Sequence, residues 1–206
     1  MMNLLAISSP GFIPEEAEII SSLFREGLTC LHIRKPESDE KDYAQLLSEI
    51  EPEFRDKIAI HQHHHLAFQF GIKRLHFTEK ERKSTLPSRL EVLAENFILS
   101  TSIHELTEME TVSALFSYTF FGPVFDSISK SGYKSVLSRV FFIEPEIKKI
   151  TIIALGGINS QNLEQIGNMN FDGAAVLGTL WENPENAIMS FRKLREVVNF
   201  INQHES

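Results

Sequence analysis

The chain has 206 residues, of which 42% are hydrophobic and 23% charged, and its formal net charge is −8. Such a composition is typical of a globular domain, and it disfavours a broad nucleic-acid interface, because contact with many phosphates requires a surplus of basic residues. A single cysteine, Cys30, excludes an internal disulfide and indicates a cytoplasmic location. No apolar run approaches the roughly 20 residues of a membrane span, and the N-terminus lacks a signal-peptide pattern. We therefore expect a protein that binds neither nucleic acid nor membrane.

Short apolar runs alternate with amphipathic stretches from one end of the chain to the other. The predicted strands are residues 3–7, 29–34, 57–61, 74–77, 97–100, 118–121, 150–155 and 173–177. The predicted helices are residues 14–26, 38–50, 64–70, 87–95, 104–115, 161–166 and 186–202, with a weak helix ahead of Pro145. Ser38 and Asn159 are the expected N-caps of two of these helices.

Strands that alternate with helices predict a parallel sheet covered by helices. Because eight such units can close on themselves, we predict a compact (β/α)8 barrel, the TIM barrel, as one α/β domain over residues 1–206. An open, doubly wound sheet is the alternative architecture. About 200 residues is the lower limit for a barrel, so the loops are expected to be short.

Two glycine turns close the last two strands of the pattern. Gly156-Gly157 follows the strand at 150–155, and Leu177 leads into Gly178-Thr179 after the next strand. Glycine lets a ligand approach the backbone closely, and free amides at the start of a following helix attract anions. Barrels often bind phosphate between the loops after strands seven and eight. We predict that these five residues bind a phosphate group, with tight turning of the chain as the alternative reason for the glycines.

A polar loop follows the sixth predicted strand. It contains Ser127, Ser129 and Lys130, whose two hydroxyls and ammonium group can donate to phosphate oxygens. As a bare sequence this is more often a solvated loop, but its position at the same end of the barrel favours a role in the phosphate site.

Several segments, in matching order, resemble the thiamine phosphate synthase/TenI family. They are Leu31-His32-Ile33-Arg34, Leu75-His76-Phe77, Ser102-Ile103-His104, Phe121-Gly122-Pro123-Val124-Phe125, Ala154-Leu155-Gly156-Gly157-Ile158 and Asp172-Gly173-Ala174-Ala175-Val176. The resemblance spans most of the chain. It implies a (β/α)8 barrel of thiamine biosynthesis that binds a small phosphorylated thiazole.

The synthase of this family joins an aminopyrimidine diphosphate to a thiazole phosphate with magnesium. By resemblance, Ser127, Ser129, Gly157 and the backbone at Leu177 and Gly178 would hold the thiazole phosphate. Arg34 and Lys130 would contact the diphosphate.

Three synthase features are altered in this chain. The synthase's Arg-x-Lys on strand two reads Arg34-Lys35-Pro36, its Asn-Asp after strand three reads His61-Gln62, and a metal-binding Asp falls on Glu81. Magnesium prefers hard oxygen ligands, so Mg²⁺ is expected as a cofactor only if synthase activity is retained.

TenI-type members share the thiazole phosphate site, and some are tautomerases that move a proton on a thiazole phosphate carboxylate. The His-Ile-Arg of strand two looks more like TenI, yet the tautomerase's histidine in the Gly-x-Val-Phe position is Pro123. The family register turns His32, Arg34, His61 and His76 inward, which makes them the candidate catalytic residues. Three histidines at one mouth could transfer protons or bind zinc, but no metal ligand is assigned; polar mouth residues are the alternative reading.

The sequence thus favours an enzyme of thiamine thiazole metabolism, either tautomerase-like or a divergent synthase. A non-catalytic or regulatory barrel that binds the same ligand is the alternative. An unrelated phosphosugar isomerase is disfavoured, because Asp126 and Glu144 lie in predicted loops and no carboxylate pair stands at strand ends. The sequence does not determine the oligomeric state, and a homodimer is one of the possible states.

Overall fold

Eight parallel strands close into a barrel in the computed structural model, which describes residues 1–112, 114–126 and 141–204. The strands are β1 (Asn3–Ile7), β2 (Leu31–Ile33), β3 (Ile58–Ile60), β4 (Arg74–Phe77), β5 (Ile98–Ile103), β6 (Phe116–Phe121), β7 (Thr151–Leu155) and β8 (Gly173–Val176). Each strand pairs with the next, and β8 pairs with β1, where Gly173 lies opposite Asn3. The predicted (β/α)8 barrel is confirmed, because a doubly wound sheet would leave both edge strands unpaired.

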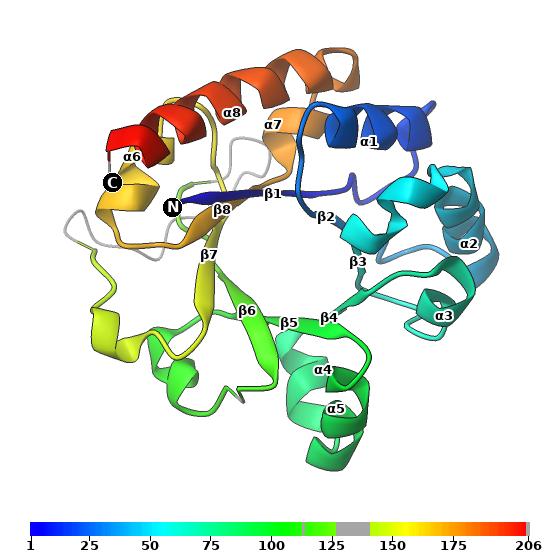
Figure 1. Ribbon diagram of the computed structural model, residues 1–206, viewed down its shortest axis with the longest axis horizontal. Coiled ribbons are helices and arrows are strands. Elements are labelled where there is room, and N and C mark those ends of the chain that lie inside the picture. The colour runs from blue at the N-terminus through cyan, green and yellow to red at the C-terminus, as the bar shows by residue number, and fades with distance from the viewer. Residues whose placement is uncertain (113, 127–140, 205–206) are drawn as a thin grey trace.

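Helices surround this ring of strands (Figure 1). They are α1 (Glu16–Arg25), α2 (Glu40–Glu49), α3 (Leu66–Phe70), α4 (Glu79–Ser84), α5 (Pro87–Ala94), α6 (Leu163–Asn168), α7 (Gly178–Trp181) and α8 (Ala187–His204). No helix in the described ranges is both long and apolar enough to cross a bilayer.

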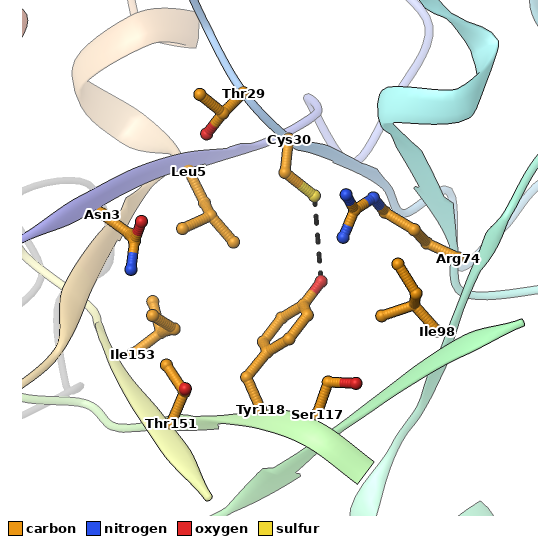
Figure 2. Close-up of a pocket in the computed structure, with 10 residues that line it drawn as sticks. All are labelled: Asn3, Leu5, Thr29, Cys30, Arg74, Ile98, Ser117, Tyr118, Thr151 and Ile153. Atoms are coloured by element: carbon orange, nitrogen blue, oxygen red, sulfur yellow. Dashed lines mark hydrogen bonds between the residues drawn. The ribbon is translucent and has the colours of Figure 1, made fainter. Parts of the chain in front are cut away.

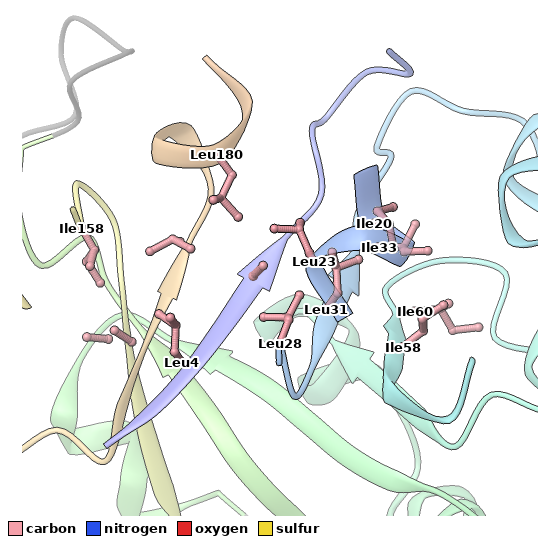
Figure 3. Close-up of a cluster of buried hydrophobic side chains, with 14 of the residues drawn as sticks. Leu4, Ile20, Leu23, Leu28, Leu31, Ile33, Ile58, Ile60, Ile158 and Leu180 are labelled. Carbon is pink, nitrogen blue, oxygen red and sulfur yellow. The ribbon is translucent and has the colours of Figure 1, made fainter. Parts of the chain in front are cut away.

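The larger hydrophobic core lies between the strands and the helices. Figure 3 shows Leu31 and Ile33 of β2 on the side of the strand that faces Ile20 and Leu23 of α1. Each such fully buried side chain contributes roughly 1.5–3 kcal/mol. Successive side chains on a strand point to opposite faces, so His32, between Leu31 and Ile33, points into the barrel.

A second, smaller cluster fills the inside of the barrel with Leu5, Cys30, Tyr118, Phe120 and Ile153 among its members. Alternation along β6 explains the pattern, because Tyr118 and Phe120 share one face of the strand. The interior is therefore apolar in part, with the histidines described below among these side chains.

Some predicted elements differ from the structure. The helix expected at 104–115 is only a short 3₁₀ helix, Leu106–Glu110, in a segment where Thr107 and Thr111 lower helix propensity. Helix α4 was missed, although Thr78 and Glu81 form a capping box at its start, a pattern readable from the sequence. The N-caps of α2 and α6 are Asp39 and Asn162, one and three residues after the predicted Ser38 and Asn159.

Candidate functional site

The two glycine turns lie side by side at the C-terminal end of the barrel. Strands β7 and β8 are neighbours, with Leu155 opposite Ala175, and Thr179 Oγ1 donates to the Ile158 carbonyl at 2.6 Å. Within the described parts of the chain, the backbone amides of Gly157, Ile158, Gly178 and Thr179 donate to no protein acceptor. The turns thus offer four free N–H groups, and their use by an anion stays a prediction.

The first of these turns requires glycine. Gly156 and Gly157 have φ of 105° and 65°, in the left-handed region that favours glycine. A Cβ at Gly157 would lie 2.5 Å from the Asp126 carbonyl oxygen. The Val124 amide also donates to the Leu155 carbonyl at 2.9 Å, so a third segment, ending at Asp126, packs against the turn.

Three of the predicted phosphate ligands, Ser127, Ser129 and Lys130, follow Asp126 in sequence but lie outside the described residues. Their part in the site stays a prediction.

Gly157→Ala is expected to lower the free energy of unfolding by about 2–4 kcal/mol, because a left-handed alanine and a clash with backbone add together. Gly71→Ala is the matched control, since Gly71 has φ of 71° but nothing within 4 Å of an added Cβ. Its cost should be near 1 kcal/mol. Urea unfolding of both variants measures the difference, and equal losses would mean that close packing at Gly157 is unimportant.

His32 on β2, His76 on β4 and His61 directly after β3 meet inside the barrel. Their exposed fractions are 0%, 1% and 4%. His32 Nδ1 lies 3.0 Å from His61 Nε2, and His32 Nε2 lies 2.7 Å from the Tyr118 hydroxyl. The structure therefore brings together three of the four predicted catalytic residues in a histidine cluster, linked by hydrogen bonds to Tyr118.

His76 is fixed from both sides of its ring. Its Nδ1 lies 3.0 Å from Ser100 Oγ and its Nε2 lies 3.1 Å from Ser102 Oγ, both on β5. The ring also stacks on His61, with centroids 4.0 Å apart. Both nitrogens of His76 are thus engaged, which leaves His61 as the member of the cluster nearest to reaching a ligand.

Burial keeps these rings neutral. It lowers the pKa of His76 to about 3 and holds the pKa values of His32 and His61 well below 6.5, with repulsion from neighbouring histidines and Arg34 or Arg74 adding to the effect. Burial also raises the pKa of Tyr118 well above 10, so its hydroxyl keeps its proton. A neutral imidazole donates from one nitrogen and accepts at the other. The Tyr118–His32–His61 chain can therefore run in either direction and present His61 as a donor or an acceptor.

Arg34 and Lys35 separate at the end of β2. Arg34 is exposed, and its guanidinium contributes to the low pKa of His61 and His76, which places its charge near the cluster. Lys35 is buried, and its Nζ binds Glu16 Oε1 and Oε2 at 2.6 and 2.7 Å and the Ser9 carbonyl at 2.7 Å. Lys35 thus uses its ammonium group to bind Glu16 of α1 and is not available to a ligand.

The histidine cluster offers three nitrogens within 4.8 Å of one another, which is the spacing of a metal site. A metal must lie near the plane of each ligating ring, along the nitrogen lone pair. The rings of His61 and His76 are stacked with an angle of only 23° between them, so no ion can lie in both planes at bonding distance. The cluster in this arrangement is a hydrogen-bonded network.

Comparison with known proteins assigns the chain to a family. The family model described as "Thiamine monophosphate synthase" matches residues 4–180. The chain belongs to the thiamine monophosphate synthase family. It is 26% identical over 188 residues to the thiamine-phosphate synthase of Syntrophomonas wolfei, with 87% of each chain covered.

Solved structures agree with this assignment to the thiamine monophosphate synthase family. A thiamine phosphate pyrophosphorylase from Bacteroides thetaiotaomicron superposes with a TM-score of 0.73 at 27% identity, covering 96% of this chain and 98% of that one. One from Pyrococcus furiosus has a TM-score of 0.74 at 20% identity, covering 97% and 96%, which supports the fold.

The residues at the magnesium positions of the thiamine monophosphate synthase family do not fit that ion here. Glu81, the expected counterpart of a metal-binding Asp, accepts from the Thr78 amide and hydroxyl at its Oε2, at 2.8 and 2.7 Å. Gln62 Oε1 accepts from the Lys35 amide at 3.2 Å, and His61 is a nitrogen donor. Magnesium favours several oxygen ligands, commonly carboxylates, and this set has a single carboxylate, one of whose oxygens already caps α4.

Tyr118 and Ser100 were missed by sequence reasoning. Both touch the histidines, and the available signal was strand alternation, since Tyr118 shares a face with Phe120, and Ser100 with Ser102. Without the register between strands, the sequence could not show which histidine each would meet.

Proposed function

We propose that this chain binds a thiazole phosphate at the barrel mouth and moves a proton on it, as TenI-type tautomerases do, in place of the synthase's condensation. The observation that carries the proposal is the neutral, buried histidine cluster, in which His32 is hydrogen-bonded to His61, and His61 falls where the synthase's Asn-Asp is expected. A neutral imidazole can accept a proton at one nitrogen while it donates one from the other, whereas it supplies no oxygen ligand for a diphosphate–magnesium complex.

The adjacent glycine turns support the phosphate half of the proposal. Four amides without a protein acceptor, at Gly157, Ile158, Gly178 and Thr179 in two adjacent turns, are donors suited to phosphate oxygens. Phosphate bound there would hold the thiazole over the barrel axis, toward the histidine cluster.

Arg34 would bind the substrate and His61 would transfer the proton. The exposed Arg34 guanidinium can pair with the carboxylate of a thiazole phosphate carboxylate through two parallel hydrogen bonds. His61, at the mouth end of the Tyr118–His32–His61 chain, would take the proton from one ring position and return it to another. Tyr118 and His32, through the direction of their hydrogen bonds, would set whether His61 donates or accepts.

A non-catalytic ligand-binding barrel is the second candidate. The burial of all three histidines favours it, because a side chain that is at most 4% exposed must become accessible before it can touch a ligand. This candidate shares the phosphate site and differs only in turnover.

Binding of thiazole phosphate, followed by calorimetry, tests the phosphate half. Gly178→Asp should weaken the affinity by at least about 30-fold, because it places a carboxylate beside the anion. Ser88→Asp adds the same charge at an exposed position on α5, which packs beside β5 and not beside β7 or β8, and should leave the affinity unchanged. Equal affinity in all three proteins would place the phosphate elsewhere.

Turnover tests the chemical half. Tautomerisation of thiazole phosphate carboxylate, followed by NMR, should occur in the natural chain and fall by about 10²–10⁴-fold in His61→Asn, with binding retained. With aminopyrimidine diphosphate, thiazole phosphate and Mg²⁺, we expect no thiamine phosphate. Its formation would contradict the proposal, whereas tight binding without any turnover would identify the non-catalytic barrel.

A further inference from the structure

A cavity opens at the N-terminal end of the barrel, opposite the glycine turns. Its volume is about 400 Å³, within the range of small-ligand sites. Asn3, Arg74, Ile98 and Thr151, which are the first residues of β1, β4, β5 and β7, line its rim. The glycine turns stand at the other ends of the strands, so this cavity is separate from the candidate phosphate site.

Figure 2 shows the cavity with the Arg74 guanidinium pointing inward, toward Cys30 and Tyr118. The Arg74 side chain makes one weak contact, from Nε to the Asp56 carbonyl at 3.4 Å, and no ion pair joins it to a carboxylate within the described residues. Arg74 is only partly exposed, and its guanidinium lies among hydroxyl and apolar side chains instead of in open solvent. The cavity therefore has an uncompensated positive charge on one wall.

The remaining walls divide into two kinds. Hydroxyl groups of Thr29, Ser117 and Thr151 line the cavity together with the Asn3 amide, and all can bond to an oxygen anion. Three apolar residues, Leu5, Ile98 and Ile153, line it as well and suit a compact hydrocarbon or aromatic body. A bare inorganic anion would leave this apolar wall in water.

We propose that this cavity is a binding site for a small organic monoanion, in which Arg74 pairs with a carboxylate and the apolar wall covers the body of the ligand. The floor of the site is Tyr118, whose hydroxyl lies 3.8 Å from Cys30 Sγ and 2.7 Å from His32 Nε2. A ligand in this cavity would thus contact Tyr118, the same side chain that is hydrogen-bonded to His32 of the histidine cluster. The proposal is independent of what binds at the mouth.

Benzoate is a suitable probe, because it combines a carboxylate with an aromatic body, and calorimetry gives its affinity. Arg74→Gln should weaken benzoate binding at least about 10-fold, and the neutral benzamide should bind at least about 10-fold more weakly than benzoate. Arg89→Gln, an exposed arginine on α5, is the matched control and should bind benzoate normally. Ser117→Phe should also block binding, since Ser117 is exposed and its replacement fills the cavity without disturbing the core.

The location is checked by Gly178→Asp, which should leave benzoate affinity unchanged while weakening thiazole phosphate. Undiminished benzoate binding by both Arg74→Gln and Ser117→Phe would overturn the proposal. So would the absence of saturable binding at about 10 mM benzoate, a concentration that detects even very weak complexes.

Discussion

Lowering the pH from about 7.5 to 5 is expected to remove up to about 6 kcal/mol of stability, enough to unfold much of the protein. The reason is the burial of His32, His61 and His76, whose pKa values in the folded state are lowered, that of His76 to about 3. In the unfolded chain each titrates near 6.5. Below that pH the unfolded state binds more protons than the folded state. The histidines therefore cost no stability above about pH 6.5, and stability decreases as the pH is lowered below that value.

The size of the loss follows from linkage. Each histidine contributes about 1.4 kcal/mol per pH unit between its unfolded and folded pKa values, so three contribute about 6 kcal/mol over 1.5 units. Most carboxylates protonate at lower pH, and the pKa of Glu79 is held at about 2 mainly by its hydrogen bonds to Lys83 and His104, so they act later in the titration.

Urea unfolding at pH 7.5, 6 and 5 measures this effect. His61→Asn should reduce the loss between pH 7.5 and 5 by up to about 2 kcal/mol, because one buried histidine is gone while an amide still faces His32; His64, whose pKa burial also lowers, adds to the loss in both proteins. His65→Gln, a change at an exposed histidine of the same segment, should keep the full loss. If the natural chain unfolded at the same urea concentration at all three pH values, the histidines would not be buried and neutral.

Lys35→Met should lower the free energy of unfolding by about 3–5 kcal/mol, because it leaves the Glu16 carboxylate buried without a cation. The side chains of Lys35 and Glu16 are 0% and 2% exposed. Burial already raises the pKa of Glu16 and lowers the pKa of Lys35, so each charge depends on the other. Removing one partner is therefore more destabilising than removing both.

Chemical unfolding of three variants tests that dependence. Lys35→Met/Glu16→Gln should recover about 1–2 kcal/mol of the loss, since no unpaired charge remains although the Ser9 and Gly11 carbonyls still lack their donor. Lys41→Met, at an exposed position on α2, should change stability by less than about 0.5 kcal/mol. A double variant as unstable as the single one would show that Lys35 acts through packing and the two carbonyls alone.

The barrel was predictable because the features that indicate its strands, helices and turns are local in sequence. Alternating apolar runs and glycine turns lie within about ten residues of each other, and the adjacency of Gly157 and Gly178 follows once eight parallel strands close. The predicted helix at 104–115 was wrong because the prediction relied on the spacing of apolar residues. It gave too little weight to the low helix propensity of Thr107 and Thr111.

The site was less predictable because its contacts are made between strands. That His32 would meet His61 on one nitrogen and Tyr118 on the other depends on the register of β2 with β3 and the closure of the ring. Likewise, the sequence showed Lys35 displaced by one position, but its burial on Glu16 depends on where α1 packs. Glu81 could be matched to a metal-binding position by spacing alone, while its capping of α4 removes it from that role.

Trp181 is the only tryptophan of the chain, and it stands three residues after Gly178. Its indole Nε1 donates to the Ile7 carbonyl at 2.6 Å, which ties the segment after β8 to the end of β1. The intrinsic fluorescence of the protein therefore originates beside the turn where the anion is expected. A shift in emission on adding thiazole phosphate would give an unlabelled optical titration of that turn, with the three tyrosines contributing only a separate, shorter-wavelength background.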